Sequence, residues 1–153
     1  MCVNYKTAET SRGFLFLVGR IQNQVWGDYV KYKAIGENHL YLKAYKKGKK
    51  IATHNVVIYV LPDYRAQRFK KENPQKKLIN RIGLTVTKKV VGGAVTRSRV
   101  KRIIREAYRL TDKEYDIKKG FLVVIVAKES CIGAKSTDIQ NDMVYAYRRL
   151  EMI

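Results

Sequence analysis

The chain has few of the residues that build metal centres and disulfides. Only two cysteines, Cys2 and Cys131, occur in 153 residues, and they are far apart. The two histidines, His39 and His54, have no metal-ligand spacing with each other or with a cysteine. This pattern argues against a zinc site, and we expect free thiols and a cytoplasmic protein.

Acidic residues and long apolar runs are also scarce. The 13 acidic residues are outnumbered by 32 basic ones, which gives a formal net charge of +19. Such an excess suits nucleic acid or an anionic membrane surface better than an acidic small substrate. No apolar run approaches the roughly 20 residues that a membrane-spanning helix needs. We therefore expect a nucleic-acid partner and no membrane.

The sequence lacks the arrangement of side chains that a catalytic site requires. Neither histidine is paired with a plausible nucleophile, and no glycine-rich phosphate loop occurs. The 11 acidic residues after position 29 are scattered, whereas a metal-dependent nuclease needs clustered carboxylates. We therefore predict no catalytic residue and no metal ligand in this chain.

The most informative segment runs from Arg81 to Arg109. A strand-like alternation over 81–87 leads through Lys88-Lys89 and Gly92-Gly93 into a predicted helix over 94–109. On that helix the apolar and basic residues fall on opposite sides: Val100, Ile103, Ile104, Ala107 and Leu110 on one, and Arg97, Lys101, Arg105 and Arg109 on the other.

The charges of this helix are poorly suited to a helix that stands alone. Cations at four-residue spacing repel one another, and near the helix N-terminus they oppose the helix dipole. Phosphate oxygens at the same end would offset both effects. A solvated basic surface helix is the alternative, but the shortage of interleaved acids favours polyanion binding.

The rest of the chain predicts a mixture of strands and helices. Strands are expected over 56–61, 81–87 and 121–127, the last continuously apolar and therefore central. One helix is expected over 38–47, with Asn38 as its N-cap and Gly48 as its C-terminal stop. Another is expected to begin at Ser136 or Thr137, and its core-facing stripe is Ile139, Met143, Tyr147 and Leu150. Residues 63–78 are polar and basic and indicate a long mobile connection.

Three of the 11 tyrosines lie where they could contact a ligand. Tyr41 and Tyr45 are one helical turn apart among lysines, and Tyr59 lies on the face of its strand opposite Ile58. Aromatic rings in a basic setting suit single-stranded nucleic acid, because bases stack on the rings while cations meet the phosphates. Most of the other tyrosines are expected at the edge of the core.

The first 29 residues differ from the rest. They carry a net charge of +1, against +18 for residues 30–153. The apolar run over 14–18 is too short for a signal peptide. Residues 1–29 are either an unusual extension or not part of the natural product. We hypothesise that translation starts at Val30, leaving one domain over 30–153.

The segment from Arg81 to Arg109 closely resembles the signature of the bacterial ribonuclease P protein component. The likeness includes the Lys-Lys pair, the Gly-Ala-Val turn and an Arg-x-Arg-x-x-Arg helix, here Arg97-Ser98-Arg99-Val100-Lys101-Arg102. It extends upstream through 38–48 and 56–61 and covers about residues 30–152.

This resemblance implies a fold and a division of labour. The fold is α+β, a two-layer sandwich with helices on a four-stranded mixed sheet and a left-handed βαβ crossover. The RNA subunit of ribonuclease P supplies the Mg²⁺-dependent hydrolysis that removes the 5′ leader from precursor tRNA. The protein binds the RNA subunit and the single-stranded leader, and holds no cofactor alone.

The resemblance also implies site residues, carried over by matching position. The RNA-subunit-binding set is Lys89, Arg97, Ser98, Arg99, Lys101, Arg102 and Arg105. The set that lines the leader-binding cleft is Tyr41, Tyr45, Val57, Tyr59, Thr85 and Lys88. Two departures put details in question. Ser98 replaces the usual Asn, whose amide reaches further. Residues 90–93 are one residue longer than the usual turn, so either a β-bulge absorbs the extra residue or the helix enters at a changed angle.

Two other functions compete with this one. A ribosome-associated or general RNA-binding protein explains the charge but not the arrangement of motifs. A DNA-reading helix needs side chains such as Asn or Gln toward the bases, and none lies between Arg97 and Arg109. We therefore expect the ribonuclease P RNA subunit and precursor tRNA as partners, and no DNA.

Overall fold

The structure is a computed structural model and describes residues 32–153. The proposed extension over 1–29 and the proposed start at Val30 lie outside the described residues.

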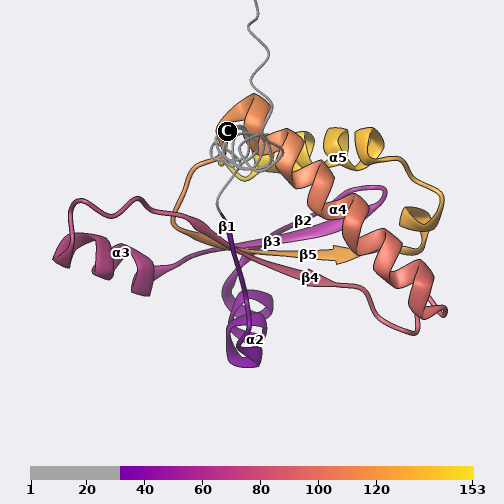
Figure 1. Cartoon of the computed structure of the whole chain (residues 1–153), viewed down its shortest axis with the longest axis horizontal. Coiled ribbons are helices and arrows are strands. Elements are labelled where there is room, and N and C mark those ends of the chain that lie inside the picture. The colour runs from indigo at the N-terminus through magenta and orange to yellow at the C-terminus, as the bar shows by residue number, and fades with distance from the viewer. Residues whose placement is uncertain (1–31) are drawn as a thin grey trace, which may run out of the picture.

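A five-stranded mixed sheet forms the centre of the protein (Figure 1). Its strands are β1 (Tyr32–Ala34), β2 (Lys49–Ala52), β3 (Val56–Pro62), β4 (Asn80–Thr85) and β5 (Phe121–Ala127), in the spatial order β1-β4-β5-β3-β2. β4 is parallel to both β1 and β5, whereas β3 is antiparallel to β5 and β2. The expected number of four strands is wrong, because the three-residue β1 adds a parallel edge beside β4.

The helices are distributed unequally over the sheet. Helices α4 (Ala94–Tyr115) and α5 (Ser136–Arg149) pack together on one face, and the shorter α2 (Asn38–Lys47) lies on the opposite face (Figure 1). Helix α3 (Tyr64–Glu72) extends away from the sheet, and a 3-10 turn, η1 (Glu129–Ile132), precedes α5. The predicted α+β class with helices on a mixed sheet is confirmed. The unit β4-α4-β5 is a parallel βαβ crossover, and its left-handed sense stays a prediction.

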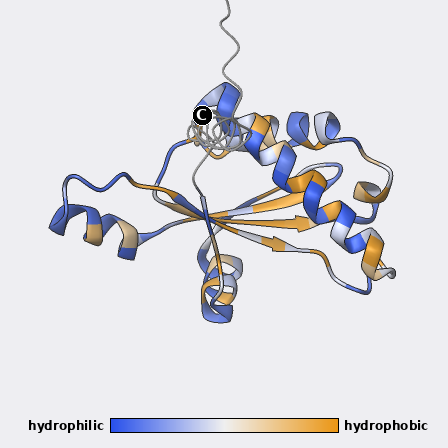
Figure 2. Ribbon diagram, viewed as in Figure 1, coloured by the Kyte–Doolittle hydropathy of each residue, from blue (hydrophilic) through white to orange (hydrophobic). Residues whose placement is uncertain are grey.

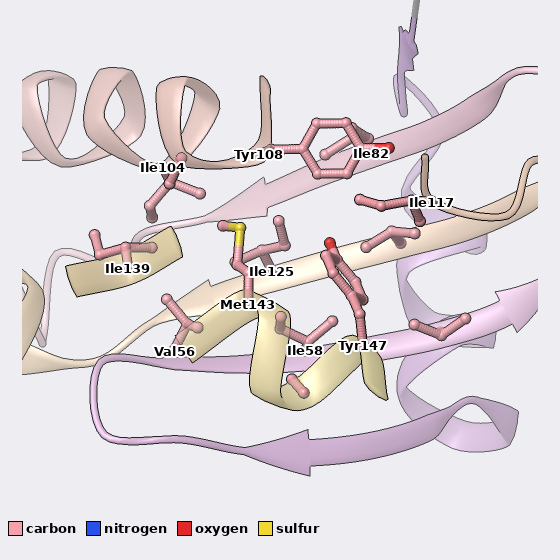
Figure 3. Close-up of a cluster of buried hydrophobic side chains, with 14 of the residues drawn as sticks. Val56, Ile58, Ile82, Ile104, Tyr108, Ile117, Ile125, Ile139, Met143 and Tyr147 are labelled. Atoms are coloured by element: carbon pink, nitrogen blue, oxygen red, sulfur yellow. The ribbon is translucent and has the colours of Figure 1, made fainter. Parts of the chain in front are cut away.

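The main core lies between the sheet and the pair α4 and α5. Ile104 and Tyr108 of α4, and Met143 and Tyr147 of α5, converge on Ile58 and Ile125 of the sheet (Figure 3). These side chains are at most 1% exposed. Burial stabilises the fold by about 25 cal/mol for each Å² of apolar surface removed from water. This contact therefore holds α4 against the sheet.

The predicted alternation along β3 and β4 is confirmed. Ile58 and Ile82 point into the main core, whereas Tyr59 and Leu61 belong to a smaller cluster beneath α2. Strand β5 is central and apolar (Figure 2), as its unbroken apolar sequence predicts. One strand face thus packs into the main core, and the other packs against α2 in the smaller cluster.

Several helix boundaries differ from the prediction. Glu37 rather than Asn38 precedes α2, and no side chain caps that helix. Lys135 rather than Ser136 or Thr137 precedes α5, where its backbone N–H donates to the Asp138 carboxylate. Gly48 follows α2 as predicted, and its N–H donates to the Ala44 carbonyl oxygen at 2.9 Å. A glycine is needed there, because a Cβ would lie 2.4 Å from that oxygen.

The expected mobile connection over 63–78 contains helix α3. The Asp63 side chain caps it by accepting from the Ala66 N–H at 3.2 Å. No residue of α3 is buried, and the helix is largely hydrophilic (Figure 2). The sequence analysis did not predict this helix within the connection, and the mobility of the connection stays a prediction.

Candidate RNA-binding surfaces

Three tyrosines form a contact cluster on the face of the sheet that carries α2. Tyr41 and Tyr45 come from α2 and have ring centroids 6.5 Å apart, while the Tyr45 ring meets Tyr59 of β3 edge-on at 5.0 Å. The Tyr45 hydroxyl lies 2.8 Å from Oγ1 of Thr85 in β4. We call Tyr41, Tyr45 and Tyr59 the tyrosine cluster. All three are half-buried, so parts of their rings remain open to a ligand.

Gly83 of β4 allows α2 to approach the sheet closely. A Cβ on Gly83 would lie 2.5 Å from a ring carbon of Tyr41. The Tyr41 hydroxyl donates to the Ile35 carbonyl at 3.4 Å, and burial, together with the neighbouring Tyr45, raises its pKa. Tyr41 is therefore a neutral phenol at physiological pH and can donate a hydrogen bond. A glycine inside a strand is a signal of such close approach, and the sequence prediction did not include Gly83 in the site.

The other two residues expected to line a leader-binding cleft are Val57 and Lys88. Val57 is half-buried on the same face of β3 as Tyr59 and pairs with Val126 of β5. Lys88 is exposed in the turn after β4, next to the equally exposed Lys89. The structure thus brings Tyr41, Tyr45, Tyr59 and Thr85 together. Val57 shares only a strand face with Tyr59, and Lys88 follows the end of β4.

Helix α4 presents a basic surface away from its buried side. Val100, Ile104 and Ala107 are fully buried against the core. Ser98, Arg99, Arg102 and Arg105 are exposed, whereas Arg97 and Lys101 are half-buried. The first turn of α4 contains no acid, and the cap residue Gly93 offers no side chain to the free N–H groups. Positive charge and unpaired backbone donors therefore coincide at the beginning of α4.

Arg97 differs from its neighbours because it stabilises the turn before α4. Its Nη1 donates to the Val91 carbonyl at 3.1 Å and to the Gly92 carbonyl at 2.6 Å. Val91 is buried, and its N–H donates to the Thr87 carbonyl at 3.0 Å. Of the two alternatives for the longer turn, a β-bulge is absent from this part of the described chain, because β4 ends at Thr85 and the segment folds as a turn.

Acidic side chains neutralise little of this surface. Arg109 pairs with Glu106 at 2.5 Å, and this arginine lowers the pKa of the Glu106 carboxyl. Within residues 32–153, no ion pair joins an acid to Arg99, Arg102 or Arg105. The positive charge near the start of α4 is therefore available to an anionic partner, whereas Glu106 partly neutralises the charge toward the end of the helix.

In the described part of the chain, no three His, Cys, Asp or Glu side chains lie close enough together to hold a metal ion. No helix between residues 32 and 153 is long and apolar enough to span a membrane.

Comparison with known families settles the relationship that the motifs suggested. The family model described as Ribonuclease P matches residues 31–151, which is most of the chain. The chain belongs to the ribonuclease P protein family. Family membership makes it a protein component related to those of an endoribonuclease.

Individual relatives agree over nearly their whole length. The chain is 36% identical over 124 residues to the ribonuclease P protein component of Clostridium acetobutylicum, covering 81% of this chain and 93% of that one. It is 34% identical over 117 residues to the ribonuclease P protein component of Alkaliphilus oremlandii, and the match covers 76% of this chain and 90% of that one.

Solved structures of the family share the fold. The ribonuclease P protein of Staphylococcus aureus superposes with a TM-score of 0.60 at 25% identity, covering 80% of this chain and 98% of that one. The ribonuclease P protein of Thermotoga maritima has a TM-score of 0.53 at 20% identity, and the match covers 69% of this chain and 86% of that one. This second likeness supports the fold alone.

Proposed function

We propose that this chain is the protein subunit of a ribonuclease P holoenzyme that removes the 5′ leader from precursor tRNA. The proposal rests on the family membership together with one observation. A basic helix surface and a half-buried tyrosine cluster lie on elements that cover opposite faces of one sheet. A protein that bridges two RNA segments needs two such surfaces.

The basic surface of α4 is the proposed contact with the RNA subunit. Arg99, Arg102 and Arg105 are exposed, and a rigid helix holds them at fixed spacing. Guanidinium groups bind phosphate oxygens through paired hydrogen bonds. Lys89, Arg97, Ser98 and Lys101 complete the proposed set, and the Ser98 hydroxyl reaches less far than the Asn amide that is usual there.

The tyrosine cluster is the proposed contact with the leader. Tyrosine rings stack on bases of any sequence, at about 1–3 kcal/mol per base. The Thr85 hydroxyl and the exposed Lys88 add a hydrogen-bonding group and a charge for the backbone. Val57 extends the same face as an apolar contact. This combination suits a single strand whose sequence differs from one precursor to the next.

The chemistry is proposed to belong to the RNA subunit. That RNA would hold the Mg²⁺ and supply the metal-dependent hydrolysis of the phosphodiester, while the protein would contribute position and charge. The proposed setting is the cytoplasm, where precursor tRNA is made, with residues 30–153 as the functional domain and with neither DNA nor a membrane as partner.

Binding of two tRNA forms tests the proposal. The holoenzyme is assembled with the unchanged chain or with a Tyr41→Ala, Tyr45→Ala double variant, and its Kd is measured for precursor and for mature tRNA. Tyr64→Ala is the matched control, because Tyr64 is 64% exposed and lies outside the tyrosine cluster.

We expect the double variant to lose about tenfold or more in affinity for the precursor, with mature tRNA and the control unchanged. Equal losses for both tRNA forms would refute the assignment of the leader to the tyrosine cluster. A protein that binds RNA generally, without a role in processing, would show no preference for the leader-bearing form in any variant.

A further inference from the structure

A hollow of about 610 Å³ lies beside α3, outside the tyrosine cluster. Its walls come from three stretches: residues 33–40, which run from β1 into the start of α2; one side of α3; and residues 76–81, which run into the start of β4. None of these segments carries a residue assigned above to RNA.

The hollow is strongly basic. Lys33, Arg65, Lys70, Lys76, Lys77 and Arg81 contribute to its lining, against one acid, Glu37. In the described chain, no ion pair joins an acid to Arg65, Lys70 or Lys77. Cations gathered around a concave surface raise the local concentration of anions. The charge points to a ligand that carries phosphate.

The hollow also has an apolar wall. Leu40, Phe69 and Leu78 take part in its lining, and the Lys76 ammonium lies 4.6 Å from the centre of the Phe69 ring. Phe69 is 46% exposed although it is a large aromatic side chain. A ligand with both a flat apolar group and phosphates, as in a nucleotide, matches this combination of wall and charge.

The hollow and the tyrosine cluster lie along the same strand face. Every second residue of β4 faces α2, namely Arg81, Gly83 and Thr85. Arg81 lines the hollow. Gly83 lies against the Tyr41 ring, and the Thr85 hydroxyl is hydrogen-bonded to Tyr45. Four residues of strand span about 13 Å. That distance corresponds to about four nucleotides at the ~3.4 Å spacing of stacked bases.

Helix α4 gives the order in which a bound strand would meet these residues. The chain passes from Thr85 through the turn into α4, so the basic surface begins at the Thr85 end of β4 and away from Arg81. A leader that leaves the RNA subunit would therefore reach Thr85 first and Arg81 afterwards.

We propose that this hollow binds nucleotides of the single-stranded 5′ leader farther from the cleavage site than those at the tyrosine cluster. Phosphates meet Arg65 and Lys70, and a base packs against Phe69. This inference rests on the proposed leader-binding function and extends it by a second subsite.

Asp63 holds the wall of the hollow in place. One carboxylate oxygen caps α3 through the Ala66 N–H, and the other pairs with Arg81 Nε at 3.1 Å. Both side chains are largely buried, at 5% and 19% exposure. α3 is thereby tied to β4, although none of its residues is buried.

Leaders trimmed one nucleotide at a time from the 5′ end provide the test, with holoenzyme Kd measured for each length. Arg65→Ala is compared with Arg68→Ala, which removes the same charge from the same helix but from a side chain outside the hollow. Phe69→Ala is compared with Tyr64→Ala on the same reasoning. Because α3 has no buried residue, all four variants are expected to keep the fold.

For long leaders, we expect Phe69→Ala to weaken binding about tenfold. Arg65→Ala should reduce the slope of log Kd against log salt by about 0.7. Both effects should vanish once the leader is too short to pass the tyrosine cluster, and the two controls should match the unchanged chain at every length.

Two outcomes would contradict the inference in distinguishable ways. If affinity rises with leader length but Arg65→Ala and Phe69→Ala behave like their controls, the hollow is not a leader subsite and the proposed function stands. If the affinity of the unchanged holoenzyme does not depend on a leader at all, the proposed function fails and this inference fails with it.

Discussion

The Tyr45 hydroxyl and the Thr85 Oγ1 lie 2.8 Å apart and join α2 to β4 across 40 residues of sequence. This hydrogen bond orients a ring that also contacts Tyr41 and Tyr59. The proposed leader site is therefore positioned by tertiary contacts, and its hydroxyl and ring contributions can be separated.

Tyr45→Phe removes the hydroxyl and keeps the ring. We expect it to cost about 1 kcal/mol of folding stability and to leave most of the affinity for precursor tRNA, whereas Tyr45→Ala also loses the stacking. Urea denaturation and precursor Kd measure the two effects. If Tyr45→Phe reduced precursor affinity as strongly as Tyr45→Ala, the ring would not be the main contact.

Arg97 and Arg99 should separate a structural role from an RNA-binding role. Arg97→Ala loses two hydrogen bonds to the turn before α4, so we expect it to destabilise the free protein by about 1 kcal/mol. Arg99→Ala should change stability by less than about 0.5 kcal/mol. Both should weaken binding to the RNA subunit, and unchanged assembly of Arg99→Ala would count against the role of α4.

Two neighbouring core tyrosines should respond oppositely to loss of their hydroxyls. The Tyr108 hydroxyl accepts from Asn80 Nδ2 at 3.1 Å, whereas that of Tyr147 is buried without a hydrogen-bond partner among the described residues. Tyr108→Phe should therefore cost about 1 kcal/mol, and Tyr147→Phe should be neutral or stabilising. Thermal denaturation measures the Tm of both variants. A large loss of Tm in Tyr147→Phe would show that the Tyr147 hydroxyl makes a hydrogen bond in solution.

Stability should fall at alkaline pH, partly because of Cys131. Burial raises the pKa of this thiol from 9.0 to about 11. Below pH 9 both folded and unfolded states keep the thiol neutral. Between pH 9 and 11 the unfolded state ionises first and is stabilised, so the free energy of unfolding decreases.

Cys131→Ala isolates this contribution. The variant is expected to be less stable at pH 7, because it loses buried volume and the bond to the Asn55 carbonyl. The difference from the unchanged chain should narrow as the pH rises from 9 to 11, as followed by urea denaturation. A constant difference across this range would show that the thiol does not ionise differently in the two states. Burial also raises the pKa of Tyr108 and Tyr147, so the variant removes only part of the alkaline loss.

The sequence predicted those elements whose patterns reflect burial. The alternation of residues along β3 and β4 predicted which side chains share a face of the sheet. The apolar stripe of α4 predicted which side of that helix is buried and that its basic side points outward. β1 was missed because three residues carry no periodic signal, and α3 was missed because it buries nothing. The hollow beside α3 depends on the ion pair between Asp63 and Arg81, which are distant in sequence, and no local pattern reveals such a contact.

Cleavage of precursor tRNA by a bacterial ribonuclease P RNA at low magnesium tests the central claim most directly, with the chain added or omitted. We predict that the protein stimulates release of an intact 5′ leader and that the protein alone releases none. Tight binding to the RNA without any stimulation of cleavage would contradict the account and favour a general RNA-binding protein.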